Sequence, residues 1–185
     1  MAKLDILRYP DPKLQTVAKP VQAVDARIRS LVADMLETMY EADGLGLAAQ
    51  QIGRPIQMCV LDVTGVKDRT SVLRLDGKAV KVEDYMPLVL INPRLELLGK
   101  PHTGIEGCLS FPGLSAGITR SFSVRVTAQD LDGGTITFEA DGLLARALQH
   151  EHDHLHGILF IDRMEAEDRE ELQSEIEDLR TSWVG

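Results

Sequence analysis

The chain has 185 residues, of which 44% are hydrophobic and 26% are charged, and its formal net charge is −9. This apolar content is sufficient for a folded domain with its own core and excludes a largely disordered chain. The negative charge argues against a general affinity for nucleic acid phosphates or anionic lipids.

The cysteines and the N-terminus indicate the compartment. Cys59 and Cys108 are far apart in the sequence, and the opening MAKLDILRYPDPKL has no apolar run of signal-peptide length. No segment approaches the roughly 18 consecutive apolar residues of a membrane span. We therefore expect a soluble cytoplasmic protein with reduced thiols and with neither a membrane nor a nucleic acid as partner.

An irregular arm and a helix are predicted first. Residues 1–22 are interrupted by three prolines, and Asp25 is suited to cap a helix that ends before Gly44. Apolar residues recur along this helix at helical spacing: Ile28, Leu31, Val32, Met35, Leu36 and Met39. The glycines and small side chains of residues 44–53, GLGLAAQQIG, then indicate backbone that approaches another group closely.

The middle of the chain is predicted to consist mostly of strands. Residues 56–63 and 87–93 are apolar enough for buried strands, and the polar stretch 64–86 between them is expected to be a surface excursion with a hairpin at Asp76-Gly77. Residues 121–140 alternate as a hairpin that turns at Asp132-Gly133-Gly134. The apolar side chains of its inward face are Phe122, Val124, Val126, Ala128, Ile136 and Phe138.

Two further helices are predicted toward the C-terminus. One covers residues 142–156 and ends at Gly157, and the other, residues 165–181, is acidic on most sides. The apolar stripe of the acidic helix consists of Leu172, Ile176 and Leu179. These elements predict one α+β domain, residues 1–185, in which short antiparallel β-sheets pack around a buried central helix.

The helix at 142–156 carries the chemistry. At about 100° per residue, His150 and His154 lie on its apolar side with Glu151 beside them. The residues on the opposite arc are Arg146, Gln149, His152, Asp153 and His156, and we expect both histidines of that arc to be solvated. Residues four apart have Cβ atoms about 5–6 Å apart, which suits two imidazoles that bind one metal ion. This is the H-E-x-x-H motif of metal-dependent hydrolases, in which the glutamate accepts a proton from water.

Other interpretations of these histidines are weaker. Burying an unpaired polar group costs roughly 2–7 kcal/mol, so buried histidines need a partner. That partner could simply be a hydrogen-bonding group in the core, but this motif on an apolar helix face favours a metal ion. A metzincin would need a histidine six residues after His154, where this chain has Phe160. A glutamate ligand of the thermolysin type would have to come from an acidic, solvated stretch that contains Glu165, Glu170 and Glu171.

Three segments together resemble the peptide deformylases. They are GLGLAAQQ at 44–51, EGCLS at 106–110 and QHEHDH at 149–154, and their order and spacing also agree, so that the similarity runs from about Leu4 to Arg163. The resemblance implies that Cys108 is the third metal ligand beside His150 and His154. A thiolate and two imidazoles leave a fourth position open, as a catalytic site requires. We interpret Cys59, inside a strand-like run, as a buried thiol, whereas Cys108 lies in a loop-like segment.

The resemblance also implies the reaction. Water activated by the metal attacks the formyl carbon of an N-formylmethionyl peptide, and Glu151 accepts the proton and returns it to the departing amine. The Gln51 side chain and the Leu109 backbone N–H donate to the oxyanion, and Gly46 presents backbone near the substrate. Fe²⁺ is the family's native ion, and Zn²⁺, Ni²⁺ or Co²⁺ can take its place.

The candidates for the methionine pocket are Leu45, Leu143 and Ala147. Glu106 and Arg120 are expected to form a buried ion pair that holds the cysteine segment.

The chain departs from the family pattern in two places. Some members carry an arginine seven positions after the cysteine, where this chain has Ser115, which leaves peptide contacts there in doubt. The C-terminal helix is acidic rather than basic, so docking on ribosomal RNA through it is not supported, although the nascent N-formylmethionyl polypeptides bring the enzyme near the ribosome. The rival functions are a zinc endopeptidase and a non-catalytic, deformylase-like metal-binding protein.

Overall fold

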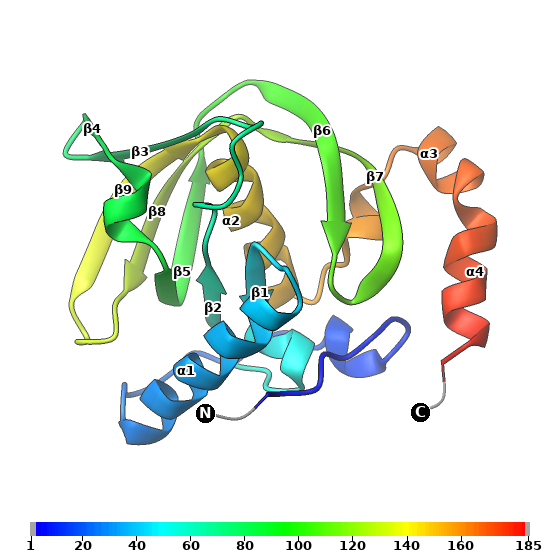
Figure 1. Cartoon of the computed structure of the whole chain (residues 1–185), viewed down its shortest axis with the longest axis horizontal. Coiled ribbons are helices and arrows are strands. Elements are labelled where there is room, and N and C mark those ends of the chain that lie inside the picture. Colours follow the sequence, from blue (N-terminus) through cyan, green and yellow to red (C-terminus); the bar gives the residue numbers. More distant parts are fainter. Residues whose placement is uncertain (1–2, 184–185) are drawn as a thin grey trace.

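The structure, a computed structural model, describes residues 3–183 and places helix α2 between two β-sheets (Figure 1). The larger sheet has seven antiparallel strands in the order β1-β2-β5-β8-β9-β3-β4, and β6 and β7 form a separate hairpin. The strands are β1 (Gly46–Ala48), β2 (Met58–Leu61), β3 (Ser71–Leu75), β4 (Lys78–Val80), β5 (Leu88–Leu97), β6 (Pro101–Cys108), β7 (Phe111–Ser121), β8 (Ser123–Gln129) and β9 (Thr135–Asp141). The predicted combination of helices with antiparallel strands is confirmed.

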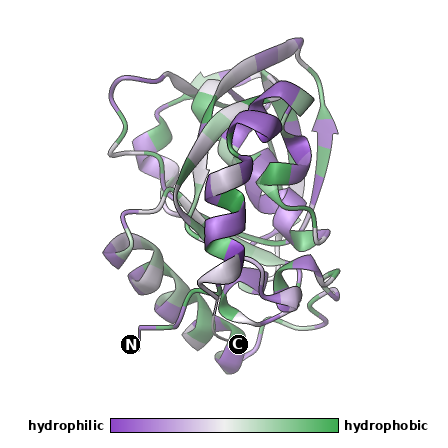
Figure 2. Ribbon diagram, turned by 90° about the vertical axis from the view of Figure 1, so that its right-hand side faces the viewer, coloured by the Kyte–Doolittle hydropathy of each residue, from purple (hydrophilic) through white to green (hydrophobic). Residues whose placement is uncertain are grey.

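The N-terminal prediction is confirmed in its main features. Residues 3–22 form an arm whose only helical segment is a short 3-10 turn, Pro12–Gln15, while residues 1–2 lie outside the described part of the chain. Helix α1 spans Ala26–Glu41, and the Asp25 carboxylate accepts hydrogen bonds from the first backbone N–H groups of this helix. Figure 2 shows α1 alternating between hydrophilic and hydrophobic segments, as expected for a helix with one buried face.

The stretch 64–86 lies largely at the surface, as expected, but part of it also extends the large sheet, which was not expected. β3 pairs with β9 inside the large sheet, and Leu73 is only 1% exposed. The predicted turn at Asp76-Gly77 is present, because both residues have positive φ and join β3 to β4 as a tight hairpin requires. The polar composition did not reveal this pairing with the sheet, because only one residue of the segment is fully buried.

The hairpin predicted at 121–140 is confirmed in its pairing but not at its first residue. β8 and β9 are joined in the expected register, with Val126 opposite Phe138. Phe122 was predicted to face inward with Val124, yet it is 44% exposed because it lies in a bend between β7 and β8. The inward-facing series therefore begins at Val124, two residues later than the pattern indicated.

The acidic C-terminal helix is divided in two. α3 spans Ala166–Glu171 and α4 spans Gln173–Thr181, with Leu172 at the junction, so a single helix over 165–181 is wrong. The apolar stripe is correct: Ile176 is buried, and Leu172 and Leu179 pack beside it against the core under β7. Figure 2 looks onto these two helices and shows them largely hydrophilic.

Helix α2 (Gly142–Leu155) is buried on almost all sides, because the sheet covers one side and the β6–β7 hairpin covers the other. Three residues of the predicted outward arc are therefore buried: Arg146, Gln149 and Asp153. His156 is exposed, as predicted, whereas His152 is partly buried, and this burial lowers its pKa to about 4. Among residues 3–183, no helix has both the length and the apolar character needed to cross a bilayer.

Candidate metal centre

Helix α2 brings two imidazoles to one point. His150 and His154 are one turn apart, and their Nε2 atoms are 3.2 Å from each other. The helix can run through the core because its first turns are rich in leucine and alanine. It ends at Leu155, and Gly157, whose φ is 71°, turns the chain away after it. Burial and the neighbouring His150 lower the pKa of His154, which keeps this ring in the neutral form that binds metals.

Cys108 approaches the histidines from the other sheet. It is the last residue of β6, at the start of the Leu109-Ser110 turn, rather than part of a loop as expected. Its Sγ lies 3.4 Å from His154 Nε2, and the ligand atoms of Cys108, His150 and His154 all lie within 4.8 Å of one another. One sulfur and two ring nitrogens at this spacing can hold a divalent transition-metal ion.

Glu106 fixes the orientation of His150. Its carboxylate lies 3.0 Å from His150 Nδ1, so that Nε2 of the ring faces Cys108 and His154. Arg120 donates to both oxygens of Glu106 at 2.6 and 3.0 Å, which confirms the predicted buried ion pair. Burial alone would raise the pKa of Glu106, but the hydrogen bonds from His150 and Arg120 lower it to about 2. The carboxylate is therefore charged and orders the site.

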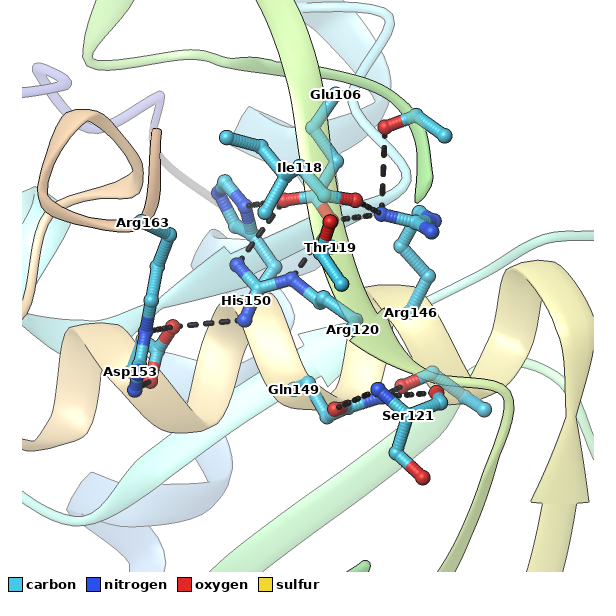
Figure 3. Close-up of polar contacts among 12 residues, drawn as sticks. Glu106, Ile118, Thr119, Arg120, Ser121, Arg146, Gln149, His150, Asp153 and Arg163 are labelled. Atoms are coloured by element: carbon cyan, nitrogen blue, oxygen red, sulfur yellow. Dashed lines mark hydrogen bonds and ion pairs between the residues drawn. The ribbon is translucent and has the colours of Figure 1, made fainter. Parts of the chain in front are cut away.

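The network extends through Asp153, whose part was not anticipated. Arg120 also donates to Asp153 at 2.7 Å, and Arg163 donates to the same carboxylate at 2.6 and 3.0 Å (Figure 3). Asp153 is adjacent to His154 in sequence. The available signal was its place within the QHEHDH segment at 149–154.

Glu151 lies on the side of α2 that faces β1. Its side chain is buried, and its Oε2 has no hydrogen-bond partner among residues 3–183. Burial raises the pKa of Glu151 to about 7. A Cβ atom added at Gly46 would overlap this carboxylate, so glycine is needed there to make room for Glu151. A carboxyl group with a pKa near neutrality and an unused oxygen is suited to exchange protons.

Gln51 lies beside Cys108 and is held there by hydrogen bonds at both ends of its amide group. Its Oε1 accepts from the Ala48 backbone N–H at 2.9 Å, and its Nε2 donates to Ser110 Oγ at 3.1 Å and lies 3.6 Å from Cys108 Sγ. The carbonyl end is thus anchored, and the amide N–H groups point toward the cysteine. Ser110, the last residue of the EGCLS segment, is a further residue of this site to which no role was assigned from the sequence.

A cavity of about 1100 Å³ opens beside these groups. All the predicted site residues except His154 line it: Leu45, Gly46, Gln51, Cys108, Leu109, Leu143, Ala147, His150 and Glu151. Ser115, at the position where some family members have arginine, also borders this cavity. The structure therefore brings together residues from β1, β6, α2 and the intervening turns around one opening.

Comparison with known proteins gives a consistent picture. A family model described as polypeptide deformylase matches residues 3–170. A peptide deformylase of Methylacidiphilum infernorum is 45% identical over 96% of this chain and 93% of the relative, and that of Neisseria gonorrhoeae is 48% identical over 89% and 88%. Among solved structures, a plant peptide deformylase has a TM-score of 0.83 at 35% identity, covering 97% of this chain and 90% of the other. A peptide deformylase from Synechococcus elongatus, solved in complex with actinonin, has a TM-score of 0.80 at 39% identity, covering 96% and 87%.

Proposed function

Because this chain belongs to the polypeptide deformylase family, we propose that it uses water to remove the N-formyl group from the N-terminal formylmethionine of newly made polypeptides, at a centre held by Cys108, His150 and His154. The observation that carries this proposal is the convergence of one sulfur and two ring nitrogens beside the buried carboxylate of Glu151. The products are formate and a polypeptide with a free α-amine.

The three ligands fit a divalent ion with an open position. Thiolate and imidazole donors suit Fe²⁺, which we propose as the native ion, and they suit Zn²⁺, Ni²⁺ and Co²⁺ equally well. When bound, the ion supplies Lewis acidity, which lowers the pKa of water toward about 7 and polarises the formyl group. The hydrogen-bonded Glu106 supports this assignment, because metal-binding histidines usually have such a partner on the other ring nitrogen.

The protein's own groups move the proton and receive the developing charge. Glu151, in the H-E-x-x-H motif of α2, accepts the proton of the attacking water and then delivers it to the α-amine that leaves. The Gln51 amide and the backbone N–H of Leu109 donate to the oxyanion. Gln51 is suited to this because its Oε1 is tied to Ala48, which leaves its N–H groups directed at the site.

The methionine side chain is proposed to enter the apolar part of the cavity. Leu143 and Ala147 line the cavity from α2, and Leu45, next to Gly46 in the sequence, also lines it. At about 1100 Å³ the cavity exceeds the usual range for small-molecule sites, so it has room for further residues of the polypeptide.

The proposed partners are nascent N-formylmethionyl polypeptides in the cytoplasm, where thiol ligands stay reduced. The chain is proposed to act as one catalytic domain over residues 1–185, with no membrane or nucleic acid as partner. The helices α3 and α4 expose many carboxylates, whose charge opposes docking on ribosomal RNA.

The proposal is tested by anaerobic purification, metal analysis and a formate-release assay on formyl-Met-Ala-Ser. We expect about one bound transition-metal ion per chain and release of formate that stops when the ion is removed. Cleavage of an internal peptide bond without formate release would identify a zinc endopeptidase. A full metal site without either activity would identify a non-catalytic metal-binding protein.

A further inference from the structure

The hairpin that carries Cys108 must be held to α2 by contacts outside the large sheet. β6 and β7 pair only with each other among the named strands, and a two-stranded hairpin has little stability alone. The two histidines are on α2, so the distance between sulfur and nitrogens depends on how this hairpin sits on the helix. A side chain that joins the two elements and also reaches a group beside the ligands therefore influences the metal centre.

Arg146 makes the densest set of these contacts. It projects from α2, is 8% exposed, and donates to the backbone oxygens of His102 at 2.7 Å and Gly104 at 3.3 Å on β6. It also donates to the Ile118 oxygen on β7 at 2.7 Å. One guanidinium from the histidine helix thus bridges both strands of the cysteine hairpin (Figure 3).

The same guanidinium reaches the group that orients a ligand. Arg146 Nη1 donates to Glu106 Oε1 at 2.7 Å, and the other oxygen of Glu106 lies 3.0 Å from His150 Nδ1. Arg146 and Arg120 therefore hold this carboxylate from two directions. Each arginine presents a positively charged guanidinium to this carboxylate.

Gly104 gives an independent indication that this contact is close. A Cβ atom added there would lie 3.0 to 3.2 Å from the nitrogens and central carbon of the Arg146 guanidinium. The φ of Gly104 is not positive, so backbone conformation does not require glycine at this position. Its small size instead permits β6 to lie directly on the arginine.

We propose that Arg146 is a positioning residue of the metal centre. It clamps the Cys108 hairpin onto α2 and holds Glu106 in the orientation that directs His150 toward the metal. This inference rests on the proposed metal site and concerns the affinity for the ion, not the chemistry of deformylation.

Gln149 provides a matched control on the same helix. It also joins α2 to the hairpin, because its Nε2 donates to the Ser121 oxygen at 2.8 Å and its Oε1 accepts from the Ser121 N–H at 3.1 Å. These contacts lie at the far end of β7 from the cysteine turn, and Gln149 forms no hydrogen bond with Glu106. Loss of Gln149 weakens the packing of the hairpin without disturbing the carboxylate.

The test compares Zn²⁺ affinity in the full chain and in the R146M, R146K and Q149M variants, measured by competition with a chromophoric chelator. We expect R146M to bind Zn²⁺ at least about tenfold more weakly. The Zn²⁺ affinity of R146K should lie between those of the wild type and R146M. Lysine can reach Glu106, but it cannot donate to the β6 backbone oxygens at the same time. Q149M should melt earlier than the wild type yet bind Zn²⁺ with the wild-type affinity. Cobalt-substituted R146M should also show a changed thiolate-to-cobalt absorption band.

The outcomes separate this inference from the proposed function. If the wild-type chain binds no Zn²⁺, the metal site itself is wrong. If the wild type binds Zn²⁺ and R146M binds it equally well, or if Q149M weakens binding as much as R146M, Arg146 has no special part in positioning. Should R146M not fold, G104A replaces it: displacement of the guanidinium by the added methyl group should weaken Zn²⁺ binding, and unchanged affinity in a folded G104A would contradict the proposal.

Discussion

The backbone of Gly46 in β1 packs so closely against the carboxylate of Glu151 in α2 that a side chain at position 46 would occupy the same space. Two motifs that are about a hundred residues apart in the sequence are therefore parts of one arrangement. In G46A the added methyl group should displace Glu151 and lower kcat at least about 100-fold, the contribution typical of a general base. Metal content should stay at the wild-type level. The control is G65A, since a Cβ there meets nothing within 4 Å and the position lies in an exposed turn; activity lost equally in both variants would contradict this account.

Replacement of Glu151 by glutamine tests proton transfer directly. The amide has nearly the same shape but cannot accept a proton at neutral pH, so E151Q should release formate at least about 100-fold more slowly. Metal content, measured by atomic absorption, should not change, because Glu151 is not among the three ligands. Wild-type turnover in this variant would remove Glu151 from the mechanism.

The two cysteines should respond differently to substitution. C108A should lose its metal on gel filtration, because the sulfur that lies beside the two histidines is removed. C59A should keep its metal and lose about 1 kcal/mol of stability, since Cys59 is a buried core residue of β2. Alkylation of the metal-free protein should label Cys108 and spare Cys59, whose pKa is raised by burial. Equal metal retention in the two variants would show that Cys108 is not a ligand.

The acid stability of the metal-free protein should depend on Glu106. Its pKa is about 2 in the folded protein against an ordinary value of 4.5, so the unfolded chain binds the proton first as the pH falls. The stabilisation is therefore complete above pH 4.5 and is lost as the pH falls toward 2. Between these pH values the free energy of unfolding, measured with urea, should fall by about 3 kcal/mol more in the wild type than in E106Q. The reason is that each pKa unit corresponds to about 1.4 kcal/mol. Parallel losses in both proteins would contradict the assignment.

The segment 64–86 should be needed for stability because β3 belongs to the large sheet. L73A removes a side chain that is 1% exposed and should lower the free energy of unfolding by about 2–5 kcal/mol. A79S, on the exposed face of the neighbouring β4, should change it by no more than about 0.5 kcal/mol. If L73A were as stable as A79S, the segment would be the dispensable excursion that its polar composition indicated.

Features that depend on neighbouring residues were predictable from the sequence. The helix after Asp25, the turn at Asp76-Gly77 and the convergence of His150 with His154 all follow from local periodicity and capping. The placement of Cys108 near these histidines required the family resemblance, since its position depends on a separate hairpin.

Features that depend on distant partners were not predictable in the same way. A helical projection assigned Arg146 and Asp153 to an outward arc, but it contains no information on the hairpin that covers that arc. Their burial is favourable only because Glu106 and Arg120 lie opposite them on β6 and β7. Phe122 followed the alternation of β8, yet a bend before that strand turns its ring outward.

The attachment of the β6–β7 hairpin to α2 has a thermodynamic consequence. An ion that joins Cys108 to both histidines connects two parts of the fold, so the folded chain binds it far more tightly than the unfolded chain does. By mass action, free ion at a hundred times its dissociation constant adds about 2.7 kcal/mol to the folding equilibrium. The melting temperature of a preparation therefore reports how much of the enzyme is loaded, before any substrate is added.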